Sequence, residues 1–319
     1  MKSQKTFLIA LGGNSILRTR EKRTIGQQYA NLQRTAKQLL ELLASDNHFV
    51  ITHGNGPQVG NLLLANELAK DVVPSMPLDV CVAATEGFIG YMIQMTLANV
   101  LRKNGFRHNI TTVVCQVVVD KDDPAFKNPT KPIGPFYSLN EAQKLRRETE
   151  WALIEDSGRG YRRVVPSPRP VGIQQARIIK SMLDAGEIVI AVGGGGIPSV
   201  RGVNRSLNGV EAVIDKDYAS SRLAIEVDAD VLLILTAVEH VFRDFGSPSQ
   251  KALNHLSLAE VKELLAEGQF GVGSMEPKIK AAIDFLEERD GEVIITLPET
   301  AMKALRGETG TRITRTKGV

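Results

Sequence analysis

Runs of consecutive apolar residues alternate along this chain with segments in which apolar residues recur every three or four positions. The runs include TFLIAL at 6–11, FVI at 49–51 and ADVLLIL at 229–235. Runs that are apolar at every position are typical of parallel strands buried on both faces. The segments between them have the spacing of amphipathic helices. This alternation predicts an α/β protein with a mostly parallel sheet.

The same patterns place the individual elements. In the helix at 257–267, Ser257 and Glu260 have the spacing of a capping box. The strands are predicted at 6–11, 49–51, 111–119, 187–192, 229–235 and 293–296, with 312–314 adding an edge strand. The helices are predicted at 27–44, 57–68, 78–102, 173–185, 218–226, 257–267 and 277–289.

Residues 121–170 interrupt the alternation. They hold seven of the 14 prolines, and most of the segment lacks apolar periodicity. We interpret 121–170 as an inserted lid or protruding subdomain. The alternative is a disordered linker, but Phe126, Ile133 and Trp151 supply apolar anchors that linkers usually lack.

Composition and charge exclude several classes of protein. The formal net charge is only +3, and no basic patch interleaved with aromatic residues is present, so nucleic acid is not an expected partner. No uninterrupted apolar run approaches the ~18 residues typical of a membrane span, and the first residues lack the apolar length of a signal peptide. Cys81 and Cys115 have no metal-binding or redox spacing. We therefore expect a cytoplasmic protein with two reduced thiols and no membrane partner.

Three glycine-rich turns follow predicted strands, at 12–15, 54–56 and 193–196. Pro57, a residue favoured at the first position of a helix, follows the second turn. Such turns direct backbone N–H groups and helix N-termini at one point, which attracts an anion. A single strand–glycine–helix turn is more often only a tight connection. Because the carboxyl ends of parallel strands form the ligand site of such sheets, three turns there indicate a groove for a polyanion.

The familiar catalytic motifs are missing. The chain has no GxxxxGK[ST], GxGxxG, HExxH or GxSxG sequence. Phosphoryl transfer remains the natural chemistry for the groove, because it needs positioning and charge neutralisation rather than covalent work. Lys216, between Asp215 and Asp217, and Lys278, near a predicted helix start, could neutralise that charge. Each lysine alone is more often a solvated surface residue.

Together these motifs resemble those of the carbamate kinases, which belong to the amino-acid kinase family. The resemblance spans the chain in order. Ser15 stands where the family commonly has alanine, and Glu86 where it often has glutamine. The motifs are ALGGNS at 10–15, THGNGPQVGN at 52–61, NPTKPIGPF at 128–136, VVPSPRP at 164–170, GGGGIP at 193–198, GVEAVIDKD at 209–217 and GSMEPKI at 273–279.

The resemblance implies a three-layer α/β/α sandwich that forms a homodimer. The N-terminal half, 1–186 with the lid at 121–170, would bind carbamate, and the C-terminal half, 187–319, would bind the nucleotide. The implied reaction is reversible phosphoryl transfer between ATP and carbamate, giving ADP and carbamoyl phosphate, with Mg²⁺ as cofactor. The resemblance does not indicate the metal ligands. Carbamate is already an anionic nucleophile, so in-line transfer needs no general base.

The resemblance also assigns site residues. Lys131 would reach from the lid into the site, Lys216 and Lys278 would stabilise the transferring phosphoryl group, and Asp217 would hold both lysines. The substrate- and phosphoryl-binding set is Gly12, Gly13, Asn14, Gly54, Asn55, Gly56, Gly194 and Gly195. The nucleotide-binding set is Asp215, Thr236, Ala237, Val238, Met275 and Pro277.

Two other functions stay open. Another small-acid kinase of the same family is one, although its known members lack the NPTKPIGPF lid. The other is a non-catalytic relative that keeps the fold and binds a metabolite. The joint presence of Lys131, Lys216, Asp217 and Lys278 argues against the latter.

Overall fold

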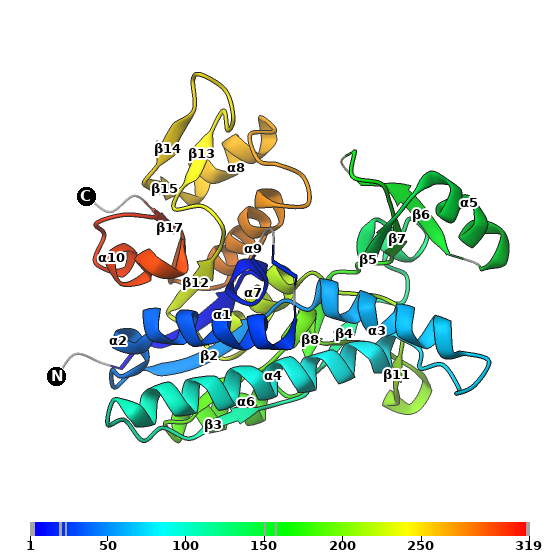
Figure 1. Cartoon of the computed structure of the whole chain (residues 1–319). Helices are drawn as coiled ribbons and strands as arrows, with labels where there is room; N and C mark the ends of the chain where they lie inside the picture. Colours follow the sequence, from blue (N-terminus) through cyan, green and yellow to red (C-terminus); the bar gives the residue numbers. More distant parts are fainter. Residues whose placement is uncertain (1–3, 19–20, 23, 150, 157, 317–319) are drawn as a thin grey trace.

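The structure is a computed structural model that describes residues 4–18, 21–22, 24–149, 151–156 and 158–316. Its centre is an eight-stranded sheet with the order β15-β17-β16-β12-β1-β2-β9-β3 (Figure 1). All neighbouring strands are parallel except β16 and β17. The strands are β1 (Thr6–Leu11), β2 (His48–His53), β3 (Ile110–Thr112), β9 (Ile188–Ile190), β12 (Val231–Leu235), β15 (His255–Ser257), β16 (Glu292–Thr296) and β17 (Thr311–Thr314).

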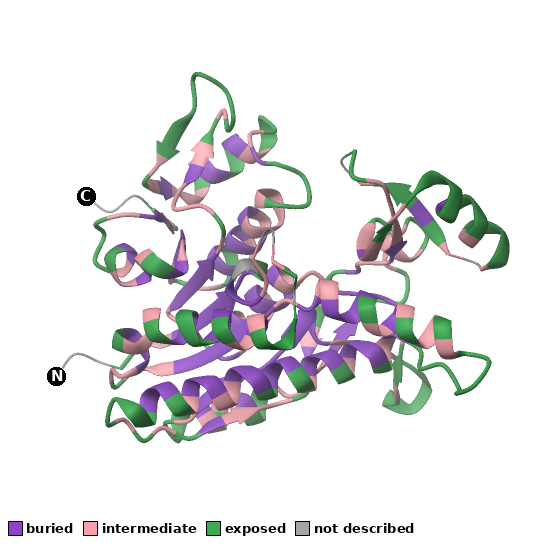
Figure 2. Ribbon diagram, in the orientation of Figure 1, coloured by how far each residue is buried: buried purple, intermediate pink, exposed green. Residues whose placement is uncertain are grey.

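Helices cover both faces of this sheet, which confirms the three-layer α/β/α arrangement. Strand β1 shows why: Leu8 and Ala10 belong to one buried cluster, and Phe7, Ile9 and Leu11 to the other. A run that is apolar at every position therefore supplies both layers. The first cluster packs under α6 (Ala176–Asp184), α7 (Lys216–Glu226), α8 (Leu258–Ala266) and α9 (Met275–Glu288). The second packs under α1 (Ile25–Gln38), α2 (Leu40–Leu43), α4 (Leu78–Lys103) and α10 (Ala301–Leu305) (Figure 2).

Helix α4 is long and apolar enough to cross a membrane by the criteria of length and composition alone. Its most apolar 18-residue window is 56% buried, and Ile89, Met92 and Ile93 belong to the core. Packing against the sheet accounts for this composition, because a buried core helix needs the same apolar residues.

Two smaller sheets flank the main one. A four-stranded sheet has the order β11-β10-β4-β8, and β13 pairs with β14 in a hairpin. The strands are β4 (Gln116–Val119), β8 (Pro170–Ile173), β10 (Ile197–Arg201), β11 (Leu207–Gly209), β13 (Val241–Arg243) and β14 (Lys251–Leu253).

Two sequence predictions of strands are wrong. The single strand predicted at 111–119 is two strands: β3 joins the main sheet, and β4 joins the four-stranded sheet. The chain changes sheet at 113–115, where Cys115 O accepts a hydrogen bond from Ile197 N at 2.8 Å. An uninterrupted apolar run cannot show such a crossing. The edge strand predicted at 312–314 lies between β15 and β16, so β15 forms that edge.

The inserted segment contains a small α/β unit that stands away from the main body (Figure 1). Its three-stranded antiparallel sheet has the order β5-β7-β6. The elements are β5 (Lys131–Tyr137), α5 (Leu139–Glu148), β6 (Ala152–Glu155) and β7 (Tyr161–Val165). The unit rests on α3 (Gly56–Ala69), where a Cβ added to Gly60 would lie 2.0 Å from Gly134 Cα. Only a glycine in α3 permits this contact between the two backbones.

Candidate active site

The three glycine turns follow the adjacent parallel strands β1, β2 and β9. They occupy 12–15, 54–56 and 193–196, and the first and third contain short 3₁₀ turns at Gly13–Ser15 and Gly193–Gly195. Because the strands are parallel neighbours, all three turns lie at the same edge of the sheet. The topology therefore brings the three turns together, and the groove for an anion between them stays a prediction.

The turns contact one another closely. A Cβ added to Gly194 would lie 2.1 Å from Nδ2 of Asn55, and Gly194 has a φ of +69°. Asn55 is buried, and its Nδ2 donates a hydrogen bond to Thr85 Oγ1 at 2.8 Å. Gly12 N donates to Leu235 O at 2.9 Å, so the first turn also contacts the end of β12. These contacts fix the turns relative to one another.

Two lysines from different helices converge on Asp217 in the first turn of α7. Lys216 Nζ lies 2.5 Å from Asp217 Oδ1, and Lys278 Nζ of α9 lies 3.0 Å from Asp217 Oδ2. Asp217 is 4% exposed. Burial opposes its ionisation, but Lys216 and Lys278 outweigh burial and hold the pKa of Asp217 below its ordinary value. The carboxylate therefore stays ionised and fixes both ammonium groups.

The lysine pair lies beside the second glycine turn. A Cβ added to Gly54 would meet the Lys216 side chain, with Cδ 3.6 Å away. The Lys278 ammonium also donates to Ser274 O at 3.1 Å, which ties it to the N-terminal end of α9. Segments more than 200 residues apart in the chain thus form one cationic site at the groove.

The lid reaches the same cluster through Lys131, the first residue of β5. Lys131 Nζ forms an ion pair with Asp215 Oδ2. Asp215 is the N-cap of α7, and its Oδ1 accepts a hydrogen bond from Asp217 N at 2.9 Å. One carboxyl group therefore joins the lid to the helix that carries Lys216.

An apolar pocket of about 260 Å³ adjoins Lys278. It contains four of the residues predicted to bind nucleotide: Thr236, Ala237, Val238 and Met275. Phe242, Phe245 and Phe270 also line it, and none of the three belongs to the predicted nucleotide-binding set. Aromatic and apolar walls with few polar groups are typical of pockets for a flat organic ligand.

The chain matches the family model described as the amino acid kinase family over residues 5–296. It belongs to the amino acid kinase family. The chain is 49% identical to the carbamate kinase of Thermococcus kodakarensis over 98% of this chain and 99% of that protein. It is 48% identical to the carbamate kinase of Clostridium perfringens, over 97% and 99% of the two chains. A solved carbamate kinase from Giardia lamblia, bound to AMP-PNP, superposes with a TM-score of 0.91 at 43% identity, covering 98% of this chain and 99% of that one.

Two predicted nucleotide-binding residues of this amino acid kinase lie outside the lining of the apolar pocket. Asp215 pairs with Lys131, and Pro277 lies in α9, so their contacts with a nucleotide stay predictions. Gly13 and Gly56 have no atom within 4 Å of an added Cβ, so the structure leaves room for a side chain at both positions. The side chain of Asn14 lies outside what the structure describes.

Two buried titratable residues beneath the glycine turns of this family member were missed as parts of the site. They are His53, the last residue of β2, and Glu86 of α4, which are 0% and 1% exposed. Two signals pointed to Glu86: it is a charged residue inside an otherwise apolar helical stretch, and it stands where the family often has glutamine. His53 had none beyond its position before Gly54.

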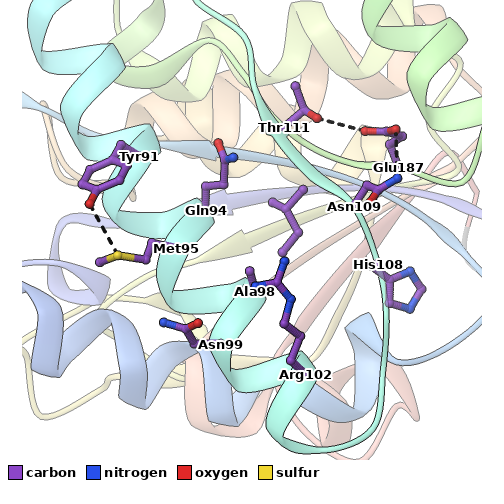
Figure 3. A pocket seen from close by; sticks show the side chains of 11 residues that line it. Tyr91, Gln94, Met95, Ala98, Asn99, Arg102, His108, Asn109, Thr111 and Glu187 are labelled. Carbon is purple, nitrogen blue, oxygen red and sulfur yellow. Dashed lines mark hydrogen bonds between the residues drawn. The ribbon is translucent and has the colours of Figure 1, made fainter.

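A second hollow, of about 450 Å³, contains none of the predicted site residues of this kinase. Tyr91, Met95 and Arg102 of α4 form one side, and Thr111 of β3 and Glu187 form the other (Figure 3). Thr111 Oγ1 donates to Glu187 Oε2 at 2.9 Å. This hollow lies beside an edge strand, away from the lysine pair, and has no part in the groove.

Proposed function

We propose that the protein catalyses reversible phosphoryl transfer between ATP and carbamate, giving ADP and carbamoyl phosphate. The observation that carries this proposal is the convergence of Lys216 and Lys278 on Asp217 beside the glycine turns. The full-length similarity to carbamate kinases at 48–49% identity supports the choice of substrate.

In the proposed mechanism, backbone N–H groups of the glycine turns hold the small anion, and the apolar pocket holds the nucleotide base. Lys216 and Lys278 neutralise charge on the phosphoryl group while it moves in line between the two oxygens. Carbamate is itself the nucleophile, so no residue is assigned as general base. The lid keeps water from the labile carbamoyl phosphate.

Mg²⁺ is proposed only as the companion of the nucleotide phosphates. Among the residues that the structure describes, no group of three or more His, Cys, Asp or Glu side chains could hold a metal ion. Asp215 and Asp217, the carboxylates at the groove, are paired with lysines. Mg²⁺ is commonly bound through substrate phosphates and water. These residues do not form a dedicated metal site, and we assign no step to the metal.

The test is ATP formation by the purified protein from ADP, Mg²⁺ and carbamoyl phosphate, followed in a coupled assay. Turnover with carbamoyl phosphate and none with acetyl phosphate or N-acetylglutamyl phosphate is the expected result. Turnover with N-acetylglutamyl phosphate alone would identify a different small-acid kinase of the family. Binding of ADP without turnover of any of the three would indicate a non-catalytic relative.

Replacing Lys131 by alanine is expected to raise the KM for carbamoyl phosphate about tenfold and to leave the KM for ADP within about twofold. Lys131 lies in the lid and pairs with Asp215, whereas the apolar pocket has no lid residue in its lining. Steady-state kinetics with each substrate varied in turn measures both values. Equal losses for the two substrates would count against a lid contact to the small anion.

We also propose that a second copy of the chain packs on the face formed by α4 and the edge strand β3. Tyr91 is 57% exposed on this face, and β3 leaves one side of the main sheet unpaired by described residues. Unpaired strand edges and exposed aromatic side chains are typical of interfaces. Sedimentation equilibrium should then give about twice the 34.8 kDa of one chain. A monomer at micromolar concentration would contradict the proposal.

A further inference from the structure

A buried carboxyl group in α4 holds the backbone of the third glycine turn. Glu86 Oε1 accepts a hydrogen bond from Gly193 N at 2.9 Å, and Glu86 Oε2 accepts one from Cys115 N at 3.1 Å. Gly193 begins the turn after β9, and Cys115 precedes β4. One side chain therefore joins the turn to the point where the chain leaves the main sheet. No other acceptor for Gly193 N is found in the described part of the chain.

A buried imidazole, that of His53, contacts the backbone of the second glycine turn. His53 Nδ1 lies 3.2 Å from Gly54 O. A carbonyl oxygen only accepts, so Nδ1 carries the proton and Nε2 is a bare acceptor. Nε2 is buried and has no hydrogen-bond partner among the residues that the structure describes. The ring thus fixes the direction of the Gly54 carbonyl.

The two side chains meet at Gly193. A Cβ added to Gly193 would lie 2.2 Å from His53 Nε2 and 3.0 Å from Glu86 Cγ. The imidazole of His53 and the side chain of Glu86 therefore pack against Gly193 so closely that no methyl group fits there. A shift of either side chain must move the turn, because packed interiors transmit displacement.

Burial favours the neutral form of each of these two groups. Burial raises the pKa of Glu86 to about 8, against the opposing hydrogen bonds from Cys115, Gly193 and Val192. Burial also lowers the pKa of His53 to about 4. Burial therefore opposes a fixed charge on either side chain at this place in the fold. This arrangement suits a support for the turns better than a direct ligand for phosphate.

We propose that Glu86 and His53 are positioning residues that act together to set the separation of the second and third glycine turns, and thereby the affinity for the small anionic substrate. The substrate named here rests on the proposed function. Neither residue lines the apolar pocket, so replacing either one should leave the affinity for the nucleotide unchanged. The two side chains should also act as one unit, since both reach the groove through Gly193.

The test compares the wild type with Glu86→Leu, Glu86→Gln, His53→Phe and the double variant Glu86→Leu/His53→Phe. Glu86→Leu should raise the KM for carbamoyl phosphate about tenfold, because both backbone N–H bonds are lost, and should leave the KM for ADP within about twofold. Glu86→Gln has one acceptor oxygen and should raise the first KM less, about threefold. The double variant should raise the KM for carbamoyl phosphate no more than the single variant with the larger increase.

Glu226→Leu is the matched control. Glu226 of α7 is a half-buried carboxyl group whose pKa is also raised by burial, and its oxygens accept a hydrogen bond from Ile173 N, outside the groove. Both leucine variants should lower Tm, but only Glu86→Leu should change the KM for carbamoyl phosphate. If Glu86→Leu does not fold, Glu86→Gln and His53→Phe provide the same comparison.

The outcomes separate this inference from the proposed function. A wild type that does not turn over carbamoyl phosphate overturns the proposed function and the substrate named here. A wild type that turns over, with an unchanged KM for carbamoyl phosphate in Glu86→Leu or in Glu86→Gln and His53→Phe, overturns the positioning role alone. Equal increases in both KM values, or additive effects in the double variant, also overturn it.

Discussion

Replacing Lys216 by alanine is expected to lower kcat by about two to three orders of magnitude. Lys216 carries one of the two ammonium groups that Asp217 fixes beside the second glycine turn. The charge of the transferring phosphoryl group is spread over its oxygens in the transition state. Loss of a cation therefore raises the free energy of the transition state most. The variant should therefore lose kcat and kcat/KM together, as expected for an interaction made mainly in the transition state. Initial rates over a range of both substrates measure the two constants.

The fold should survive this substitution. Asp217 keeps its contact with Lys278, so the buried carboxylate is not left without a cation. Lys262→Ala is the matched control, because Lys262 pairs with Glu287 at 2.6 Å on the surface and is 48% exposed. Its kcat should stay within about twofold of the wild type. A folded Lys216→Ala protein with near-normal kcat would remove Lys216 from the mechanism.

Replacing Gly195 by alanine should lower kcat/KM by about 100-fold and also lower Tm. A methyl group at Gly195 would lie 2.2 Å from Ile214 O and 2.9 Å from Ile214 C, which are backbone atoms. Ile214 directly precedes Asp215 and Lys216, so the clash must displace the segment that begins α7. A displacement of about 1 Å at a reacting group is enough for a loss of this size.

The control for this variant separates strain from displacement. Gly268 and Gly195 both have a left-handed backbone, with φ of +71° and +98°. A Cβ added to Gly268, however, meets no atom within 4 Å. Gly268→Ala should lose about 1 kcal/mol of stability from the left-handed backbone and keep full activity. Kinetics and thermal unfolding of both variants make the comparison. Equal activity in the two would show that the contact with Ile214 does not position the lysine.

The sequence predicted most of the strands and helices because, in these elements, the local pattern of apolar residues matches the faces that are buried in the fold. Strand β1 is apolar at every position after Thr6 since both of its faces are buried, and its predicted bounds, 6–11, match the structure. The capping box of α8 is present, with Ser257 Oγ accepting from Glu260 N at 3.3 Å. The glycine turns were predicted to share a groove because strands of one parallel sheet end at the same edge.

The parts that sequence reasoning missed depend on contacts between distant segments. The sequence marks Glu86 as a charged residue in an apolar helical stretch, but its contacts with Gly193 N and Cys115 N join segments that are distant in the chain. The aromatic wall of the apolar pocket, including Phe242 and Phe270, lies in segments without a motif. The division of 111–119 between two sheets also depends on partners, namely β9 for β3 and β10 for β4.

Each lysine of the groove has a carboxylate partner from the chain itself. Lys131 is paired with Asp215, and Lys216 and Lys278 share Asp217, which leaves a single excess positive charge on the group. A phosphate that contacts these ammonium groups must compete for them with the carboxylates of Asp215 and Asp217. The free energy of phosphate binding is then the difference between two sets of ion pairs rather than the full value of one. For the reversible transfer proposed above, this difference keeps binding weak enough for release of either substrate.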